Sequence, residues 1–439
     1  MYIRAIELTD LRAFAKARLE FLYPGRKLSK TPFTSAGRTA LTDPRHANMN
    51  IVLGVNGSGK STVLDAIALA LLSPIPQNGF VPNSLIRKSN RGQLDSAKVK
   101  LELVLHPIDS VRGAGQEQWD DELKCQVLRE GDYEFLEGPK TGDARFKELF
   151  LDRSPAFTLL GYGVFRRVEA LNQSELLSSR QKRRSARYDR VATLFEDDVP
   201  LIPLSSWFPA IPAGERRDEI IALINKATPK TVRFAGKLSL HGEMIFKYRN
   251  LELPFSALSD GYRGHLGWVG DLLYRLQDVA PPTLKLNELP GVVLVDEIDA
   301  HLHPAWQQEI IGALAKAFPK IQFIFTTHSP LITGTLERAN INVVTRRGSS
   351  PPIVEPPEIE MYGLSSDQIL RTDLFGLEST RDPDFRADLL ATRKDAEDGK
   401  AGAAVAFMRK AALGAGAEQG LQAEAPPTPE WLKQMARKS

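Results

Sequence analysis

The sequence predicts an α/β protein built around a mainly parallel sheet. Residues 48–72 contain an apolar strand, a glycine-rich turn and a helix whose apolar residues recur at helical spacing. Two more apolar strands, within 291–299 and 321–330, flank a helical segment at 303–319. Strands that alternate with helices along a chain form parallel sheets with right-handed crossovers. The three strands are therefore expected to end at one edge of a common sheet.

Other segments predict an antiparallel β layer beside this sheet. Two short strands are expected around the N-terminal LTDLRAF stretch, and strand-like runs occupy 97–107 and 125–138, the second with a Gly-Asp turn. A further β stretch covers 231–250 and precedes a long helix that begins near Asp260. Because no sustained heptad pattern is present, no long coiled coil is expected.

We expect one large domain at 1–346, with an insertion at about 107–255 that includes a helical and basic part. A C-terminal extension follows at 347–439. It is rich in Ala, Gly and Pro from Lys400 onward, so we expect it to be partly flexible near its end.

The composition is that of an ordinary globular protein. The 439 residues are 42% hydrophobic and 25% charged, which excludes a disulfide miniprotein and a disordered tail. The single Cys125 cannot form an intrachain disulfide, and the start lacks a secretion signal. No uncharged apolar run approaches the roughly 18 residues that span a bilayer. We therefore expect a soluble, cytoplasmic protein without membrane contact.

The net charge of +3 argues neither for nor against a polyanionic partner. Basic residues nevertheless gather at 180–190 against the single acid Asp189. They are Arg180, Lys182, Arg183, Arg184, Arg187 and Arg190. A solvated loop or helix face explains such a cluster, and so does contact with nucleic acid or an acidic partner. The sequence leaves both interpretations open.

Residues 54–61 read GVNGSGKS and match the phosphate-binding pattern G-x-x-x-x-G-K-[ST]. Glycines let successive backbone N–H groups point at phosphate oxygens, and the helix that follows adds positive potential at its N-terminus. Lys60 is expected to neutralise the β- and γ-phosphates during catalysis, and Ser61 to hold Mg²⁺ through its hydroxyl. The residues expected to bind the nucleotide here are Asn56, Gly57, Ser58, Gly59, Lys60, Ser61 and Thr62.

Polar side chains follow the two later strands. Asp296 and Glu297 come directly after an apolar strand, where Asp296 suits the Mg²⁺ shell and Glu297 suits the general base for the attacking water. His328 ends the next strand, where it can donate to a γ-phosphate and report its presence. Taken alone, each pattern also fits a structural role, as a strand-to-loop cap or a hydrogen-bonded histidine.

Residues 255–263, FSALSDGYR, lie between the phosphate loop and the two carboxylates. Taken alone, Ser259 is a helix N-cap and Asp260 complements the helix dipole. Together with the other motifs, the segment resembles the LSGGQ signature loop of the ABC ATPase superfamily, and the family's motif order is complete. The resemblance implies that Ser259 and Gly261 of one protomer cap ATP held by another. It thus implies a homodimer around ATP and Mg²⁺ and leaves a higher oligomer open.

This copy departs from the family pattern at two positions. Asp260 stands where the first Gly of the motif is expected, and Tyr262 stands where the Gln is expected. A carboxylate close to a γ-phosphate repels it by on the order of 1 kcal/mol or more, so slow turnover is expected. Gln93 and the turn at 161–163 are the candidates for the family's Q-loop.

The N-terminal LTDLRAF arrangement, DEIDAHLHP and TTHSP resemble the soluble RecF/OLD/SMC-like branch of the superfamily over roughly residues 1–346. In this branch Arg12 corresponds to an arginine near the phosphates. Within the branch, 258–276 and 363–377 look like the stand-alone ATPases of bacterial anti-phage systems, such as PtuA of Septu or AriA of PARIS.

The resemblance implies an ATP-binding and ATP-hydrolysing switch that controls or scaffolds a separate effector nuclease. About 110 residues follow His328, without the acidic cluster of the nuclease that OLD enzymes add. The alternative is a RecF-like repair ATPase that clamps DNA in an ATP-dependent way, which leaves contact with nucleic acid open. A transporter subunit is disfavoured by the modified signature and the antiparallel insertions.

Overall fold

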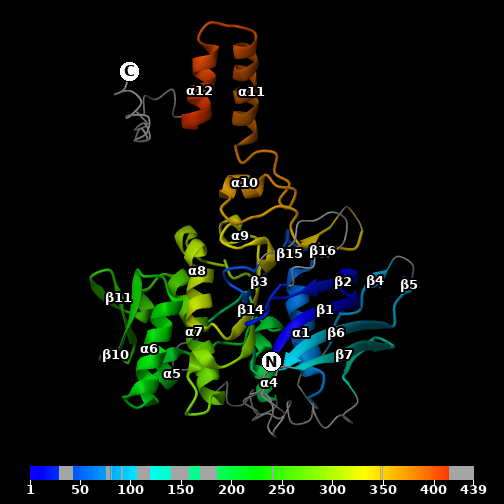
Figure 1. The fold of residues 1–439 in the computed structure, drawn as a ribbon, viewed down its shortest axis with the longest axis vertical. Coiled ribbons are helices and arrows are strands. Elements are labelled where there is room, and N and C mark those ends of the chain that lie inside the picture. Colours follow the sequence, from blue (N-terminus) through cyan, green and yellow to red (C-terminus); the bar gives the residue numbers. More distant parts are fainter. Residues whose placement is uncertain are drawn as a thin grey trace. The chain divides into compact units, whose positions relative to one another are not determined.

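The computed structural model describes residues 1–28, 43–75, 80, 82–89, 92–105, 119–139, 158–168, 185–239, 242–346, 348 and 350–414. The chain divides into two compact units, Met1–Ile369 and Leu370–Ser439. Figure 1 shows the elements coloured along the chain.

The first unit contains a six-stranded sheet with the order β16-β15-β3-β14-β13-β9. Neighbouring strands are parallel except for the pair β15 and β16. The strands are β3 (Met49–Leu53), β9 (Leu159–Tyr162), β13 (Gly291–Val295), β14 (Ile321–Thr327), β15 (Ile341–Thr345) and β16 (Ile353–Glu355). Every residue of β3, β13 and β14 is buried, as in parallel sheets covered on both faces. The carboxyl ends of these three strands lie at one edge of the sheet.

A second sheet has five antiparallel strands in the order β2-β1-β6-β7-β8. They are β1 (Tyr2–Leu11), β2 (Phe14–Glu20), β6 (Ser96–Leu105), β7 (Trp119–Glu130) and β8 (Tyr133–Glu137). A short hairpin joins β4 (Lys88–Ser89) to β5 (Gly92–Gln93). The predicted fold class, a mainly parallel sheet beside an antiparallel layer, is confirmed.

Helix α1 (Lys60–Leu72) lies between the two sheets. All its residues except Ser61 are buried, and it contacts β6 and β7 as well as β14. A helix that is apolar on nearly all faces is stable in water only when it is covered in this way. The packing fixes the N-terminus of α1 at the edge of the sheet where β3 ends.

A small antiparallel sheet contains β10 (Val232–Leu238), β11 (Met244–Tyr248) and β12 (Leu251–Pro254). Further helices of the first unit are α4 (Ala186–Asp189), α5 (Leu204–Trp207), α6 (Glu215–Ala227), α7 (Asp260–Val279), α8 (Pro304–Ala317) and α9 (Pro330–Thr333). Helix α6 packs on α7, α8 and β10. The β stretch predicted at 231–250 and the helix predicted from Asp260 are both present.

The basic segment 180–190 is only partly described, because its first five residues lie outside the described part of the chain. The two arginines of the segment that are described, Arg187 and Arg190, are 2% and 7% exposed. Arg190 also lies 3.5 Å from Asp278 of α7. These two residues therefore belong to the interior, and the solvated-face interpretation is wrong for them.

The described part of the second unit contains two helices after a non-helical stretch at 371–382. Helices α11 (Pro383–Glu397) and α12 (Ala403–Leu413) pack on each other, and α10 (Ser366–Leu370) ends at the unit boundary. Asp382 caps α11 by accepting hydrogen bonds from two backbone N–H groups. Residues 415–439, the end that was predicted to be flexible, lie outside the described residues. Among the helices that are described, none is long and apolar enough to cross a membrane.

Asp271 ties α7 to the parallel sheet. Its buried carboxylate accepts hydrogen bonds from the Tyr162 hydroxyl of β9 (2.9 Å), the backbone N–H of Ile202 (3.0 Å) and Nε of Arg275 (3.1 Å). Burial and the nearby carboxylate raise the pKa of Tyr162 well above its ordinary value, so its hydroxyl stays a donor. The middle of α7 is thus held against the sheet.

Asp271→Ala should lower the free energy of unfolding by about 3 kcal/mol, because it leaves Arg275 and Tyr162 buried without their acceptor. Urea denaturation followed by circular dichroism measures the change. Glu309→Ala, at an exposed position of α8, is the control, and we expect a change below about 1 kcal/mol there. Equal losses in both variants would contradict the role of Asp271.

Candidate functional site

The phosphate loop connects β3 to α1 at the carboxyl edge of the parallel sheet. Gly57 and Gly59 have φ angles of 75° and 109°, a region that favours glycine. A Cβ atom at Gly59 would also lie 2.9 Å from the Phe14 ring, and one at Gly54 would lie 2.6 Å from the Val344 carbonyl oxygen. The loop conformation therefore requires the glycines that the motif supplies.

The N-terminus of α1 is open to an anion. Its first turn has no acidic residue, and no side chain caps it within the described structure. Ser61 is exposed there, whereas Ser58 Oγ is buried and has no hydrogen-bond partner among the described residues. Backbone N–H groups and an unpaired hydroxyl at a positive helix end are the groups that bind phosphate oxygens.

Lys60 is held across the loop. Its Nζ donates to the carbonyl oxygens of Gly54 (2.9 Å) and Val55 (3.2 Å). Burial lowers the pKa of Lys60, and the carboxylates of Glu297, Asp296 and Asp299 oppose this effect. The predicted cation and the predicted carboxylates are thus close enough to interact.

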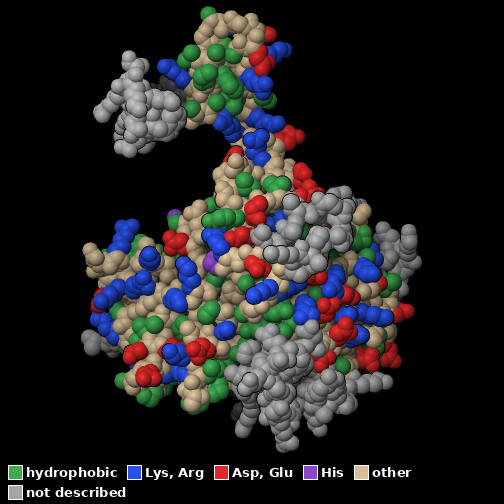
Figure 2. Space-filling model, in the orientation of Figure 1, with side chains coloured by type: hydrophobic (Ala, Val, Ile, Leu, Met, Phe, Trp, Pro, Cys, Tyr) green, Lys and Arg blue, Asp and Glu red, His purple; other side chains and the backbone are tan. Residues whose placement is uncertain are grey.

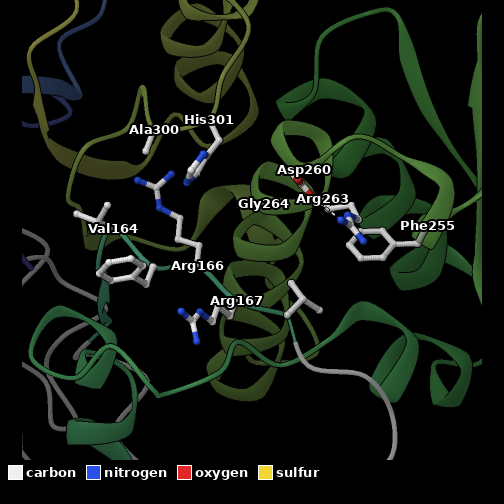
Figure 3. A pocket seen from close by; sticks show the side chains of 11 residues that line it. Val164, Arg166, Arg167, Phe255, Asp260, Arg263, Gly264, Ala300 and His301 are labelled. Carbon is white, nitrogen blue, oxygen red and sulfur yellow. Dashed lines mark hydrogen bonds and ion pairs between the residues drawn. The ribbon is translucent and has the colours of Figure 1, made fainter.

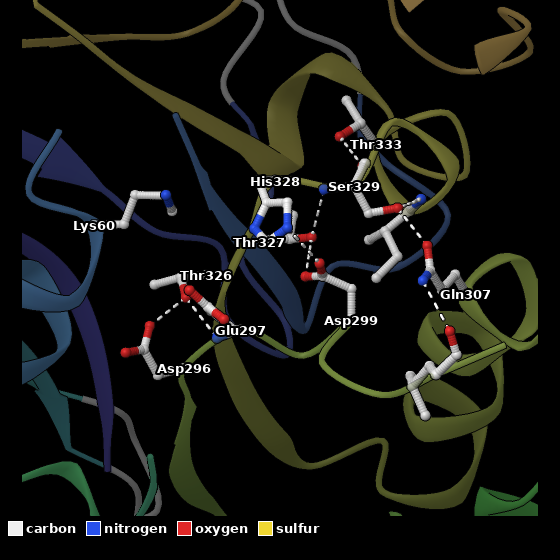
Figure 4. Close-up of polar contacts among 12 residues, drawn as sticks. Lys60, Asp296, Glu297, Asp299, Gln307, Thr326, Thr327, His328, Ser329 and Thr333 are labelled. Atoms are coloured by element: carbon white, nitrogen blue, oxygen red, sulfur yellow. Dashed lines mark hydrogen bonds and ion pairs between the residues drawn. The ribbon is translucent and has the colours of Figure 1, made fainter. Parts of the chain in front are cut away.

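Asp296 and Glu297 directly follow β13 and are fixed by one hydroxyl of the neighbouring strand. Thr326 Oγ1 of β14 donates to the Asp296 carboxylate and accepts the backbone N–H of Glu297 at 2.7 Å (Figure 4). Asp296 is 8% exposed. Glu297 has φ 45°, an uncommon conformation for a residue with a side chain. Sequence reasoning missed Thr326, because only the strand pairing places its hydroxyl here.

His328 is exposed and lies close to a second buried carboxylate. Its Nε2 is 3.5 Å from Asp299, and Asp299 also accepts a hydrogen bond from Thr327 Oγ1 at 2.5 Å. Figure 4 shows the His328 ring next to the Asp299 side chain, with Ser329 nearby. Ser329 in turn donates to Gln307 of α8 at 2.6 Å. Asp299 was not among the predicted nucleotide-site residues, because the resemblance assigns the segment that begins with it to the family's D-loop at the dimer interface.

Arg12 occupies an unusual position near α1. It has φ 44°, and its guanidinium pairs with Asp65 at 2.5 Å. Burial raises the pKa of Asp65 to about 7, against the opposing effect of Arg12, and Asp296 raises it further. An ionisable residue within an otherwise apolar helix was the available signal for Asp65. The structure thus pairs the predicted phosphate-proximal arginine with a carboxylate.

The signature segment lies at the start of α7, against the loop that follows Glu297. Ser259 is the N-cap by its backbone, but its side chain makes no capping hydrogen bond to α7. A Cβ atom at Gly261 would lie 2.3 Å from the His301 carbonyl oxygen, so glycine allows this close approach. Asp260 pairs with Arg263, which compensates its charge, and the Tyr262 ring packs on Trp306 at 4.1 Å.

The structure therefore brings part of the predicted site together within one chain. Lys60, Asp296, Glu297 and the phosphate loop share the sheet edge, whereas Ser259 and Gly261 sit on another element, at the head of α7. Of the two Q-loop candidates, Gln93 is in β5, which pairs with β4, and 161–163 covers the end of β9, which pairs with β13.

A family model described as "AAA domain, putative AbiEii toxin, Type IV TA system" matches residues 49–333. The match covers more than half of the chain, from the start of β3 to the end of α9, and includes the phosphate loop, both carboxylates and His328. The chain belongs to this family of ATPase domains.

Curated relatives carry names from two kinds of system. Septu protein PtuA of Bacillus mycoides (strain KBAB4) is 26% identical over 380 residues, which cover 86% of this chain and 45% of that protein. The retron Vc95 probable ATPase of Vibrio cholerae is 23% identical and covers 78% of this chain and 76% of that protein. The retron Ec83 probable ATPase of Escherichia coli is 42% identical over 99 residues, 23% of this chain and 18% of that protein. The resemblance to PtuA-type ATPases is confirmed, while this chain spans less than half of the Bacillus mycoides PtuA.

Solved structures show a more distant likeness. An SMC head bound to the C-winged helix domain of ScpA has a TM-score of 0.48 at 17% identity, covering 82% of this chain and 99% of that chain. The SMC head domain from Thermotoga maritima has a TM-score of 0.43 at 16% identity, covering 82% and 100%.

The residues present fit a nucleoside triphosphate with Mg²⁺. The open helix end, the unpaired Ser58 hydroxyl and the Lys60 cation suit the phosphates. The exposed Ser61 hydroxyl beside them and the Asp296 carboxylate are oxygen ligands of the kind that Mg²⁺ takes together with phosphates.

Asp65→Asn should change how stability depends on pH. In the folded protein the pKa of Asp65 is raised from 3.8 to about 7, so between these values the folded state holds more protons than the unfolded state. The carboxyl therefore lowers wild-type stability as pH rises through this window, whereas asparagine does not titrate. Relative to wild type, the variant should gain about 2 kcal/mol between pH of about 5 and about 8. Urea denaturation at several pH values measures this gain.

Asp132→Asn, in the exposed turn between β7 and β8, is the matched control and should show no such trend. A stability difference between Asp65→Asn and wild type that stays constant over this pH range would contradict the raised pKa.

Proposed function

We propose that the chain is an ATP-binding and ATP-hydrolysing switch of an anti-phage defence system that controls or scaffolds a separate effector nuclease. The ATPase part of the proposal is supported by one observation. Lys60 lies close enough to Asp296 and Glu297 to interact with them, at the edge where β3 and β13 end. A fixed cation and a bare helix N-terminus beside two carboxylates suit the binding and hydrolysis of a phosphate anhydride.

Each residue has a separate role in this proposal. The backbone N–H groups of 57–62 and the Lys60 ammonium bind the phosphate oxygens. Ser61 and Asp296 would hold Mg²⁺, which neutralises phosphate charge when it is bound. The Glu297 carboxylate accepts the proton of the attacking water, and Thr326 fixes the backbone from which that carboxylate extends. His328, placed beside Asp299, donates to the γ-phosphate.

We further propose that a second copy completes the site. The Ser259 hydroxyl makes no capping bond to its own helix, so it is available to a nucleotide held by a partner. Arg263 compensates Asp260 and reduces its repulsion of the γ-phosphate. The Asp260 side chain is 83% exposed, so the compensation is incomplete and turnover is expected to be slow.

The defence part of the proposal is supported by the relatives, which are named as a Septu protein and as retron ATPases. The separate effector is supported by the resemblance to stand-alone ATPases. The alternative of a DNA-clamping repair ATPase requires cations that face the phosphate backbone. Arg187 and Arg190 of the basic segment are buried and do not supply such cations, while its other four basic residues lie outside the described part of the chain.

Glu297→Gln should keep ATP binding but lower kcat by about 10²–10⁴-fold, because the amide cannot accept the proton. Phosphate release measures kcat, calorimetry with Mg·ATP measures affinity, and sedimentation velocity should show an accumulated dimer. Glu309→Gln, at an exposed position of α8, is the control. Hydrolysis at the wild-type rate in Glu297→Gln would refute the assignment of the base.

Mixing two inactive variants tests whether the active site is shared. Lys60→Ala should lose ATP binding, and Ser259→Arg should block the partner's nucleotide. In a mixed dimer one site carries both defects and the other carries neither, so an equimolar mixture should recover about a quarter of wild-type activity. The double variant Lys60→Ala/Ser259→Arg, mixed with wild type, is the control. If the mixture stays inactive while each variant still dimerises, the shared site is wrong.

A further inference from the structure

An open pocket of about 490 Å³ lies beside the loop that follows Glu297. Three segments line it: the residues after β9, the start of α7 with the turn before it, and the loop itself. Figure 3 shows Arg166 pointing toward Ala300 and His301, with Asp260 and Arg263 across the opening. The pocket therefore lies between the loop that follows Glu297 and the start of α7.

The pocket lining carries excess positive charge. Arg166, Arg167 and Arg263 line it together with a single carboxylate, that of Asp260. Because Asp260 pairs with Arg263, no carboxylate of the lining pairs with Arg166 or Arg167. The carboxylates that act on Arg166, those of Asp296, Asp299 and Glu297, lie outside the lining. A ligand with an anionic group complements this charge.

The same pocket offers apolar surface. Phe165 is 48% exposed, and Val164, Val168 and Phe255 also line the opening. The volume suits a few side chains. A nucleic-acid backbone is instead bound by a stripe of many cations along a surface. The arginines and the apolar side chains of the lining together favour a protein segment that carries a carboxylate next to an apolar side chain.

Arg166 connects the pocket to the proposed general base. Its guanidinium donates to the backbone carbonyl oxygens of Asp296 and Glu297, the latter at 2.6 Å, and its Nε donates to Gly163 O at 3.1 Å. Burial lowers the pKa of Arg166 to about 10, which leaves it charged near neutral pH. These three carbonyl acceptors are neutral, and a carboxylate is a stronger acceptor for a guanidinium.

We propose that this pocket binds a carboxylate-bearing segment of a protein partner and that Arg166 transmits the binding to Glu297. The bound carboxylate competes with the two backbone carbonyls for the Arg166 guanidinium. Loss of those hydrogen bonds releases the backbone of Glu297 from its φ of 45° and slows hydrolysis. Arg166 is thus a positioning residue. The binding step does not depend on the role of Glu297, whereas the transmission step rests on the proposed function.

The binding step is tested with a phage-displayed library of random dodecapeptides, panned on the full chain with counter-selection on Arg167→Glu. Enriched peptides should carry Asp or Glu beside Phe, Leu or Ile. A synthetic copy of an enriched peptide should bind Arg167→Glu at least about tenfold more weakly than it binds wild type. An analogue with Asn or Gln in place of Asp or Glu should bind wild type at least about tenfold more weakly than the acidic peptide does. Arg233→Glu, on the exposed side of β10, is the control and should bind like wild type.

Three outcomes would overturn the binding step: no enrichment, enriched peptides without carboxylates, or equal affinity for wild type and Arg167→Glu. A labelled 20-nucleotide DNA strand is tested in parallel. If wild type binds the strand and Arg167→Glu does not, while no acidic peptide binds, the pocket is a nucleic-acid site and the protein-ligand proposal is wrong.

The transmission step is tested by steady-state kinetics with the selected peptide at saturation. The peptide should lower wild-type kcat at least about threefold without changing KM for ATP. Arg166→Lys keeps the charge but cannot bridge both carbonyls, so it should bind the peptide and show no further change in kcat. An unchanged wild-type kcat would overturn transmission. A wild-type rate in Glu297→Gln would overturn the proposed function and leave the binding result intact.

Discussion

The site depends on the register of three buried parallel strands. Pairing aligns Val295 of β13 and Ile51 of β3 with the same residue of β14, Phe325, and aligns Leu53 with Thr327. Since these strands are covered on both faces, a slip by one residue would carry polar side chains into the interior. The register therefore aligns the ends of β3, β13 and β14 to within a few residues. As a result, the phosphate loop, the two carboxylates and the histidine, which follow these strands, lie at one edge of the sheet.

Charge balance at this edge is the second constraint. Three carboxylates, those of Asp296, Glu297 and Asp299, lie near the buried cations Lys60 and Arg166. Hydroxyls of Thr326 and Thr327 hold two of the carboxylates by hydrogen bonds. Charged groups away from water are stable when they are paired and hydrogen-bonded in this way. The same arrangement keeps the groups preorganised, which is the property that phosphoryl-transfer sites use.

The elements that carry the motifs were predictable because their signals are local. The turn at 54–61 needs glycine at defined positions, and the strands before Asp296 and His328 are continuous apolar runs. The partners of these motifs were less accessible. Thr326 serves Asp296 only because β14 lies next to β13, and the Asp65 partner of Arg12 lies 53 positions away along the chain. Ser259 is another example. Its sequence pattern fits an N-cap, but the pattern does not reveal that the hydroxyl makes no hydrogen bond to the helix.

By itself, the sequence determined the strand and helix segments, the phosphate loop, the acidic pair after β13 and the family resemblance, because spacing along a chain encodes local conformation and motif chemistry. Only the tertiary structure decided which side chains meet across strands, that Arg187 and Arg190 are buried, and that Arg166 contacts the carbonyls of Asp296 and Glu297. The physical reason is that burial and charge pairing depend on segments far apart in the chain, whose separation is fixed by packing.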